Sequence, residues 1–386
     1  MAGIILVAFN LRPSLTAVGP LVGWIRDEFM ISNGTAGVLT TLPLVAFAIL
    51  SAIAPRLSLR IGNGRSILLG LVVLTVGIVF RSVEWLSALF AGTALIGIGI
   101  AICNVLLPAI VKQHFPAKVG LLTGLYSISM SAFAALGSGV SYPLADSLAA
   151  GWQGSLRIWG VLALIGLIVW LPQARLKRKP ERIPKIDIKN SPLLRSKIAW
   201  QVTLFMGLQS FMFYCLITWL PEILQSRGMA PSEAGWMLSW LQLVGLPITF
   251  LTPVLAGRMK NQQGMVWGIG SVYIIGLIIL LFSEDFIPLV LAVALMGIAQ
   301  GGAISLALTL ISLRAPTAVQ ASNLSGMAQS FGYFLAAVGP VSIGFLFDEV
   351  QSWTIAILIF LLVVLGMIMS GNGAGRNMYV PEENLS

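Results

Sequence analysis

A single arginine stands inside the first apolar stretch of the chain. Residues 3–22 form an almost uninterrupted apolar run, in which Arg12 follows Asn10 and precedes Pro13. About 20 apolar residues cross a hydrocarbon core of about 30 Å, and a rise of about 1.5 Å per residue places Arg12 roughly 15 Å into it. A cation at that depth is costly and usually functional.

Three kinds of group could offset the charge of Arg12. Pro13 interrupts the helix and frees backbone carbonyls, water in a cavity could solvate the guanidinium, and an anionic or strongly polar substrate could bind its planar fork of donors. No acidic residue falls deep inside an expected span, so no deep carboxylate is expected to pair with it. Substrate binding is the favoured hypothesis for Arg12, and a structural role is the alternative.

Polar and aromatic side chains in other apolar runs could complete the same cavity. Asn10 and Gln209 occupy similar places in the first apolar runs of the two halves of the chain. Tyr126 and Tyr333 lie in corresponding later runs and could stack on a planar ring or bond through their hydroxyls. Each alone is more often a packing residue or a satisfied core group. The predicted substrate-binding set is Arg12, Asn10, Gln209, Tyr126, Tyr333, Asn104 and Trp219.

The composition predicts an all-α protein that crosses a membrane many times. Of the 386 residues, 57% are hydrophobic and only 10% are charged, which a soluble domain does not tolerate. Apolar runs between charged or Pro/Gly-marked breaks predict 12 transmembrane helices. The predicted spans are 3–22, 34–54, 66–82, 86–110, 119–142, 155–172, 198–220, 232–256, 265–282, 286–312, 322–346 and 352–370.

The net charge of +9 reflects topology. Most of the 23 Lys and Arg residues fall in alternate loops, and short loops rich in these residues stay in the cytoplasm. Both termini are therefore predicted to be cytoplasmic. The basic stretch 175–197 is interpreted as a solvated linker that touches anionic lipid headgroups, and nucleic-acid binding is not expected.

The two halves of the chain resemble each other at a shift of roughly 200 residues. Pro55, Arg60, Asn63 and Gly70 correspond to Pro253, Arg258, Asn261 and Gly268. This repeat predicts a six-helix half at 1–172, a basic cytoplasmic linker at 173–197, a second six-helix half at 198–370 and a cytoplasmic tail at 371–386.

The sequence carries little other chemistry. Cys103 and Cys215 lie in apolar runs without metal-ligand spacing and are interpreted as packing residues. No HExxH, GxSxG or P-loop motif occurs, and the single histidine, His114, has no evident triad partner. An enzyme is not predicted, and neither a cofactor nor a metal is expected. No chain of buried acids or histidines suggests a proton relay, so uniport, exchange and coupling through helix-end acids such as Asp27 and Glu222 stay open.

Several motifs resemble one known transporter family. They are Asn10-Leu11-Arg12-Pro13, Val18-Gly19-Pro20-Leu21, Leu39-Thr40-Thr41-Leu42-Pro43-Leu44, Asn104-Val105-Leu106-Leu107-Pro108, Gly151-Trp152-Gln153-Gly154, Trp219-Leu220-Pro221 and Leu324-Ser325-Gly326-Met327-Ala328-Gln329-Ser330. Together they resemble the cyanate and 2-nitroimidazole porter group of the major facilitator superfamily. The resemblance implies that superfamily's fold, with two six-helix halves, alternating access around a cavity near the bilayer midplane and solute transport across a bacterial inner membrane.

The superfamily's loop signature Gly-x-x-x-Asp-Arg-x-Gly-Arg-Arg is only partly present. Arg60, Gly62 and Arg65 fit it, whereas Leu59 replaces the acid and Gly64 replaces one arginine. The resemblance implies a gating loop at Arg60, Gly62 and Arg65, with Arg258 as the counterpart in the second half.

The predicted function is transport of a small anion or polar planar solute, cyanate-like or 2-nitroimidazole-like, with Arg12 in contact with it. The expected partners are this solute and the lipid bilayer, with protons as an open possibility and a monomer as the expected state. A multidrug exporter of the same fold is the alternative within transport. A membrane enzyme and a non-transporting sensor or scaffold are the alternatives from other classes.

Overall fold

The computed structural model describes residues 1–115, 119–147, 151–174 and 192–380, and every regular element in these ranges is a helix. In the N-terminal part the helices are α1 (Ala2–Asn10), α2 (Pro13–Thr16), η1 (Gly19–Leu21), α3 (Val22–Phe29), α4 (Asn33–Ile61), α5 (Asn63–Arg81), α6 (Leu86–His114), α7 (Val119–Ser147), α8 (Gly151–Arg157) and α9 (Trp159–Ala174). The remainder are η4 (Pro192–Arg195), α10 (Lys197–Gln225), α11 (Pro231–Arg258), α12 (Gln263–Phe282), α13 (Phe286–Leu313), α14 (Ala318–Val350) and α15 (Trp353–Ala374). The all-helical fold class is confirmed.

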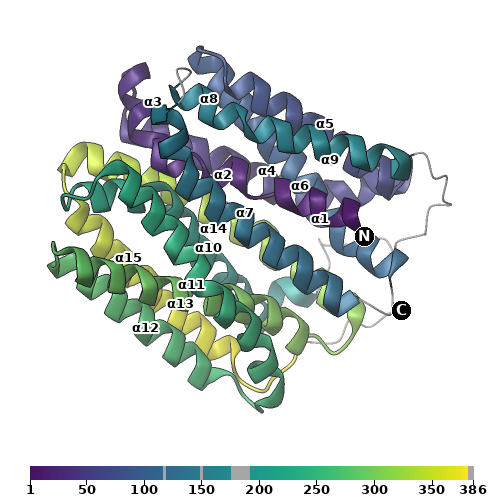
Figure 1. Ribbon diagram of the computed structural model, residues 1–386. Coiled ribbons are helices and arrows are strands. Elements are labelled where there is room, and N and C mark those ends of the chain that lie inside the picture. The colour runs from purple at the N-terminus through teal and green to yellow at the C-terminus, as the bar shows by residue number, and fades with distance from the viewer. Residues whose placement is uncertain (116–118, 148–150, 175–191, 381–386) are drawn as a thin grey trace. The chain divides into compact units, whose positions relative to one another are not determined.

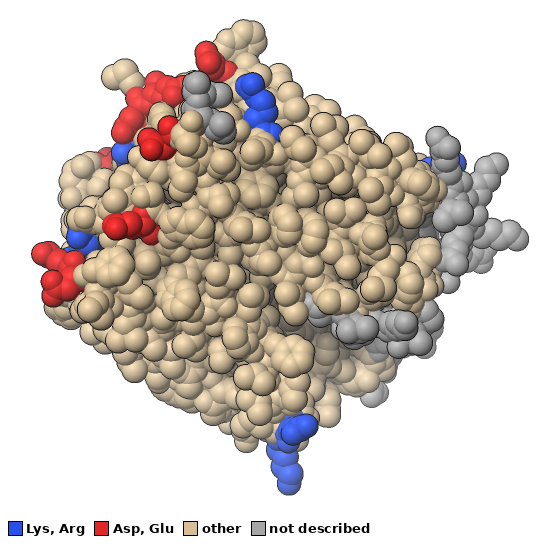
Figure 2. All heavy atoms as spheres, in the orientation of Figure 1, with Lys and Arg blue, Asp and Glu red and all other residues tan. Residues whose placement is uncertain are grey.

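Eleven stretches of the described residues are long and apolar enough to cross a membrane. They match eleven of the predicted spans, although the first extends from Ala2 to Phe29 rather than ending at residue 22. The predicted span 119–142 is not among the eleven, but the 29-residue helix α7 occupies that place. Large apolar side chains such as Phe282 and Leu362 are exposed, and most of the face in Figure 2 carries no charged side chain. A surface of this kind suits lipid.

The described residues fall into two compact units. Unit 1 comprises Met1–Ile183, Ile217–Ser239 and Pro340–Glu349, and unit 2 comprises Pro184–Leu216, Trp240–Gly339 and Val350–Ser386. Unit 1 thus includes the ends of α10 and α14 and the start of α11, which belong to the predicted C-terminal half. The halves and their boundaries stay a prediction, and most of the predicted linker lies outside the described residues, as does the end of the tail.

In unit 1, α5 packs against both α6 and α9. Figure 1 shows α5 and α9 side by side, and the contacts between them are extensive. On another face α5 packs so closely on α6 that a Cβ on Gly99 would lie 2.5 Å from the carbonyl oxygen of Gly70. Small residues allow this approach and substitute for a hydrophobic driving force between helices in lipid.

Candidate functional site

The first membrane-spanning stretch is a broken helix, and Arg12 lies at the break. Helix α1 ends at Asn10, and Arg12 caps α2, which has Pro13 at its first position. A proline fits the start of a helix because its missing N–H needs no partner there. The carbonyl of Arg12 accepts from the N–H groups of Leu15 (2.9 Å) and Thr16 (3.1 Å). Helix α2 is followed by a short 3-10 turn containing Pro20 before α3 begins.

Side chains on α2 and on its neighbour α7 each bond to the backbone of the other helix. The hydroxyl of Thr16 donates to the carbonyl of Ala134 on α7 at 2.8 Å. Ser138, one turn further along α7, donates to the carbonyl of Thr16 at 3.4 Å. Phe9 stacks on Phe133 with ring centroids 4.0 Å apart. The broken helix is therefore docked on α7 by both polar and aromatic contacts.

The predicted substrate-binding residues of unit 1 differ in their burial and in their hydrogen bonds. Arg12 is half-buried at the break, whereas Asn10 is buried and donates its amide to the carbonyls of Leu6 (2.8 Å) and Leu162 (3.3 Å). The bond to Leu162 ties α1 to α9. Asn104 on α6 and Tyr126 on α7 are half-buried, on two helices that contact α1.

Trp219 has a packing role in the structure. Its side chain is fully buried, and its indole N–H donates to the carbonyl of Pro340 at 2.9 Å. Buried tryptophans usually find such a partner. The bond links α10 to α14 within unit 1. The proposed substrate contact of Trp219 stays a prediction.

In unit 2, Gln209 is the centre of a buried polar network. Gln300 on α13 donates to the Gln209 side-chain oxygen at 3.1 Å and accepts from the hydroxyl of Tyr273 on α12 at 2.8 Å. Gln209 also donates to the hydroxyl of Ser210 at 2.7 Å. Tyr333 is half-buried on α14. Gln209 and Tyr333 therefore lie in unit 2, and the other five predicted binding residues lie in unit 1.

Three predicted gating residues, Arg60, Gly62 and Arg65, lie at the turn from α4 to α5. The fourth, Arg258, is the last residue of α11. Arg60, Arg65 and Arg258 are exposed. Gly62 joins α4 directly to α5 with φ of +88°, a backbone conformation that glycine adopts without strain. A gating role for these residues stays a prediction.

A cluster of charged and polar residues lies at the N-terminal end of α4. The sequence analysis did not predict that these residues contact each other. We call Arg26, Asp27, Asn33, Glu222 and Asp348 the Arg26 network. Arg26 contacts Asp27 at 2.9 Å and Glu222 at 3.2 Å, and donates to the Asn33 side-chain oxygen at 2.8 Å. Asp348 accepts from the backbone N–H of Asn33 (2.9 Å) and of Gly34 (2.8 Å), so its carboxylate sits at the N-terminus of α4, where helix dipoles favour anions.

Next to the Arg26 network, the backbone at Gly19 and Gly37 also lies close to the backbone of α10 and α14. A Cβ on Gly19 would collide with the carbonyl of Ile217, and a Cβ on Gly37 would lie 2.5 Å from the carbonyl of Pro340. Thr218 donates to the hydroxyl of Thr40 at 2.8 Å. Segments from the N-terminal part of the chain are thus tightly packed against the ends of α10 and α14.

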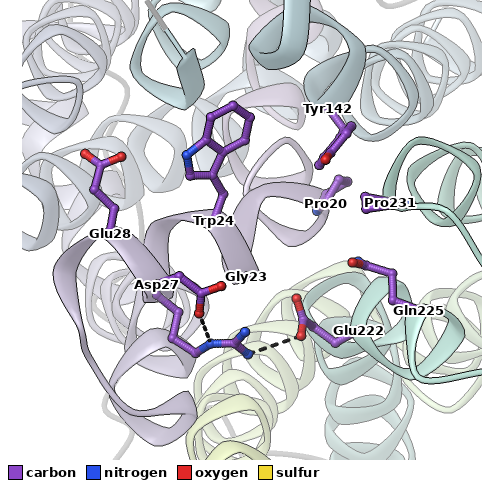
Figure 3. Close-up of a pocket in the computed structure, with 10 residues that line it drawn as sticks. Pro20, Gly23, Trp24, Asp27, Glu28, Tyr142, Glu222, Gln225 and Pro231 are labelled. Atoms are coloured by element: carbon purple, nitrogen blue, oxygen red, sulfur yellow. Dashed lines mark hydrogen bonds and ion pairs between the residues drawn. The ribbon is translucent and has the colours of Figure 1, made fainter.

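A cavity opens beside the Arg26 network (Figure 3). Its volume is about 530 Å³, and all of its lining residues belong to unit 1. The Glu222 carboxylate lies 3.2 Å from the Arg26 guanidinium, and in Figure 3 Trp24 and Tyr142 lie across the opening from Glu222. The remaining lining residues are Pro20, Gly23, Asp27, Glu28, Gln225 and Pro231. Under the predicted topology this cavity faces away from the cytoplasm.

No local sequence signal identifies the Arg26 network. Arg26 and Glu222 are 196 residues apart in the chain, yet the Arg26 guanidinium donates to the Glu222 carboxylate. The sequence placed Asp27, Glu222 and Asp348 near helix ends but carried no information about which ends meet. The predicted repeat places Arg26 and Glu222 at similar positions, at the ends of the first spans of the two predicted halves.

The comparison with known proteins agrees with this architecture. Residues 4–340 match the model of the Major Facilitator Superfamily. An uncharacterized transporter of Bacillus subtilis (strain 168) is 52% identical over 98% of this chain and 94% of its own length. The 2-nitroimidazole transporter of Escherichia coli (strain K12) is 39% identical over 98% of this chain and 95% of its own length.

A more distant relative and a solved structure extend the comparison. The cyanate transport protein of the same Escherichia coli strain is 25% identical, covering 87% of both chains. The crystal structure of a nucleoside transporter shares the fold with a TM-score of 0.79 at 11% identity, over 97% of this chain and 99% of that one. These relatives are transporters rather than enzymes. The chain belongs to the Major Facilitator Superfamily, in the group that includes the 2-nitroimidazole and cyanate transporters.

Proposed function

We propose that the protein is a secondary active or facilitative carrier of a small anion or a polar planar solute, and that Arg12 contacts this solute. The observation that carries the proposal is the break between α1 and α2, which places a half-buried guanidinium within a membrane-spanning stretch. Among the described residues, every Asp and Glu lies in a loop or within one turn of a helix end. The middle of the described spans therefore contains no carboxylate.

The chemistry of a guanidinium restricts the class of cargo. It stays protonated and presents a planar fork of donors, which matches the charge of cyanate or the paired oxygens of a nitro group. The relatives that carry the names 2-nitroimidazole transporter and cyanate transport protein support this class. Asn10, Asn104, Tyr126, Gln209, Trp219 and Tyr333 remain the proposed further contacts.

Transport by alternating access requires the Arg26 network to break and re-form. The network ties the end of α3 and the start of α4, from the proposed N-terminal half, to the ends of α10 and α14, from the proposed C-terminal half. While it is intact, together with the close contacts at Gly19 and Gly37, solute cannot pass between these segments. In the proposed orientation, with both termini in the cytoplasm of a bacterium, this is the outer seal of an inner-membrane carrier that works as a monomer.

A screen of chemically distinct solutes tests the proposed cargo class. We expect 2-nitroimidazole or cyanate to raise the apparent melting temperature of the purified protein, because a ligand that binds only the folded state stabilises it. At a ligand concentration about 100 times the Kd the gain is about 2.7 kcal/mol. The measurement is a thermal-shift assay with cyanate, nitrite, 2-nitroimidazole and benzoate.

Two comparisons make this screen decisive. Arg12→Ala should lose the stabilisation by the solute while keeping the melting temperature of the free protein within a few degrees. Stabilisation by bulky lipophilic cations, with none by the four small solutes, would instead support a multidrug exporter and contradict the proposal. Flux into vesicles with and without a pH gradient then separates proton coupling from exchange and uniport.

A further inference from the structure

The structure buries a second arginine next to the broken helix. Arg81 is the last residue of α5 and its side chain has no exposed surface. Its Nη1 donates to the carbonyl oxygen of Ser14 at 2.7 Å, while its Nε and Nη2 have no hydrogen-bond partner within the described residues. In the sequence, Arg81 stands one residue before the end of the predicted span 66–82.

The carbonyl of Ser14 needs this donor because the helix is broken. In a continuous α-helix it would accept from the N–H of Val18, four residues on. Here the N–H of Val18 donates to Leu15 at 3.4 Å, and Pro20 beyond it has no N–H. A freed carbonyl in a membrane span must find a donor from a neighbouring element. Arg81 brings that donor from α5.

The bond between Arg81 and Ser14 also attaches α2 to a second neighbouring helix. Ser14 lies two residues after Arg12, inside the four-residue helix α2. On the side of α7, α2 is held by the bonds between Thr16, Ala134 and Ser138. Arg81 supplies a separate attachment to α5, so α2 is fixed from two elements. Burying a guanidinium is costly, and a neutral side chain would fill the same space at lower cost.

We propose that Arg81 is a positioning residue, which holds the break between α1 and α2 in the conformation that presents Arg12 to the solute. The expected effect of Arg81 on solute binding rests on the proposed function. The expected effect of Arg81 on the conformation of the break does not depend on any solute. Arg81 acts through the Ser14 carbonyl and is not a substrate contact.

Hydrogen exchange measures the effect on the break directly. In protein reconstituted into nanodiscs, Arg81→Met should raise amide exchange about tenfold in peptides covering residues 11–18, because methionine fills the site without donating and local opening becomes easier. Arg81→Lys keeps a single donor and should give an intermediate rate. Unchanged exchange over residues 11–18 in folded Arg81→Met would overturn the proposal. If Arg81→Met does not fold, Arg81→Lys carries the same test.

Arg157 offers a matched control. It makes the same kind of bond, from Nη2 to the carbonyl of Ser82 at 2.8 Å, one residue beyond Arg81, but it ties α8 to the end of α5. Arg157→Met should change exchange near residues 82–86 and leave residues 11–18 unchanged. Equal acceleration of residues 11–18 by both variants would indicate general loosening of unit 1 and would overturn the specific role of Arg81.

Solute affinity provides the second readout. For whichever of 2-nitroimidazole and cyanate binds the wild type, Arg81→Met should weaken the Kd about tenfold at unchanged binding capacity, with partial recovery in Arg81→Lys. An unchanged Kd in a variant with a loosened break would overturn the link to Arg12. If neither solute binds the wild type, the proposed cargo class fails, and the exchange experiment still decides whether Arg81 holds the break.

Discussion

Arg12→Ala is expected to abolish transport of the solute that the wild-type protein carries. Removing one partner of a desolvated, hydrogen-bonded charge pair costs about 2–5 kcal/mol, and every 1.4 kcal/mol is about tenfold in affinity. The expected loss in initial transport rate at low solute concentration is therefore at least about 30-fold. The measurement is uptake of radiolabelled solute into vesicles that contain equal amounts of folded protein.

Two further variants define the cause of the loss at Arg12. Arg12→Lys should recover only part of the rate, because an ammonium keeps the charge but not the planar fork. Arg376→Ala removes an exposed arginine that follows α15 and should transport like the wild type. Folded Arg12→Ala that transports at the wild-type rate would refute the central role of this residue.

Glu222→Gln is expected to open the seal at the Arg26 network. The side chains of Arg26 and Glu222 are 24% and 15% exposed, so their pair should contribute more than a fully exposed pair, which is worth about 0.2–1 kcal/mol. A loss of about 1.4 kcal/mol would shift the closed–open equilibrium about tenfold. The amide preserves the shape of the side chain and removes only the charge.

A cysteine beneath the network can report this opening. Thr218 is buried one turn before Glu222 on α10, and residues four apart lie on the same helix face. In a Thr218→Cys background the native Cys103 and Cys215 are fully buried, so labelling by a membrane-impermeant maleimide should come from position 218. We expect Glu222→Gln to raise the labelling rate about tenfold in right-side-out vesicles.

Asp27→Asn is the matched control for this experiment. Asp27 also contacts Arg26, but its side chain is 72% exposed, so solvent screens the pair and its loss should change labelling less than about twofold. Equal labelling in Glu222→Gln and in the parent would show that the network does not seal this end. Labelling only in inverted vesicles would reverse the proposed orientation.

Local sequence patterns were sufficient to predict the membrane-spanning helices and to identify Arg12 as a cation within the first of them. Apolar runs of about 20 residues predict spans because lipid provides no partners for backbone groups, and eleven such stretches occur in the described part of the chain. Pro13 marked the place where the first span is interrupted, since proline lacks the N–H that a continuous helix needs. The motifs shared with transporters indicated the family that the comparisons confirm.

Contacts between residues far apart in the chain could not be predicted from local sequence patterns. Arg26 and Glu222, or Arg81 and Ser14, meet because helices pack, and many different packings are compatible with the same apolar periodicity. Gln209 is a predicted substrate-binding residue by its position in the sequence, and the structure adds that its side chain is fully buried beside Gln300, Ser210 and Met206. Burial depends on the neighbours of a helix face, and the sequence of that helix does not name them.

The sequence by itself thus determined that this protein is a polytopic transporter with an arginine at the interruption of its first helix, because hydrophobicity and proline act locally. Only the tertiary structure decided what surrounds that interruption. The carbonyl of Ser14 is satisfied from α5 by Arg81, and the end of α3 is joined to α10 by Arg26 and Glu222. The physical reason is that hydrogen bonds and ion pairs depend on ångström-scale distances between residues far apart in the chain, which packing alone sets.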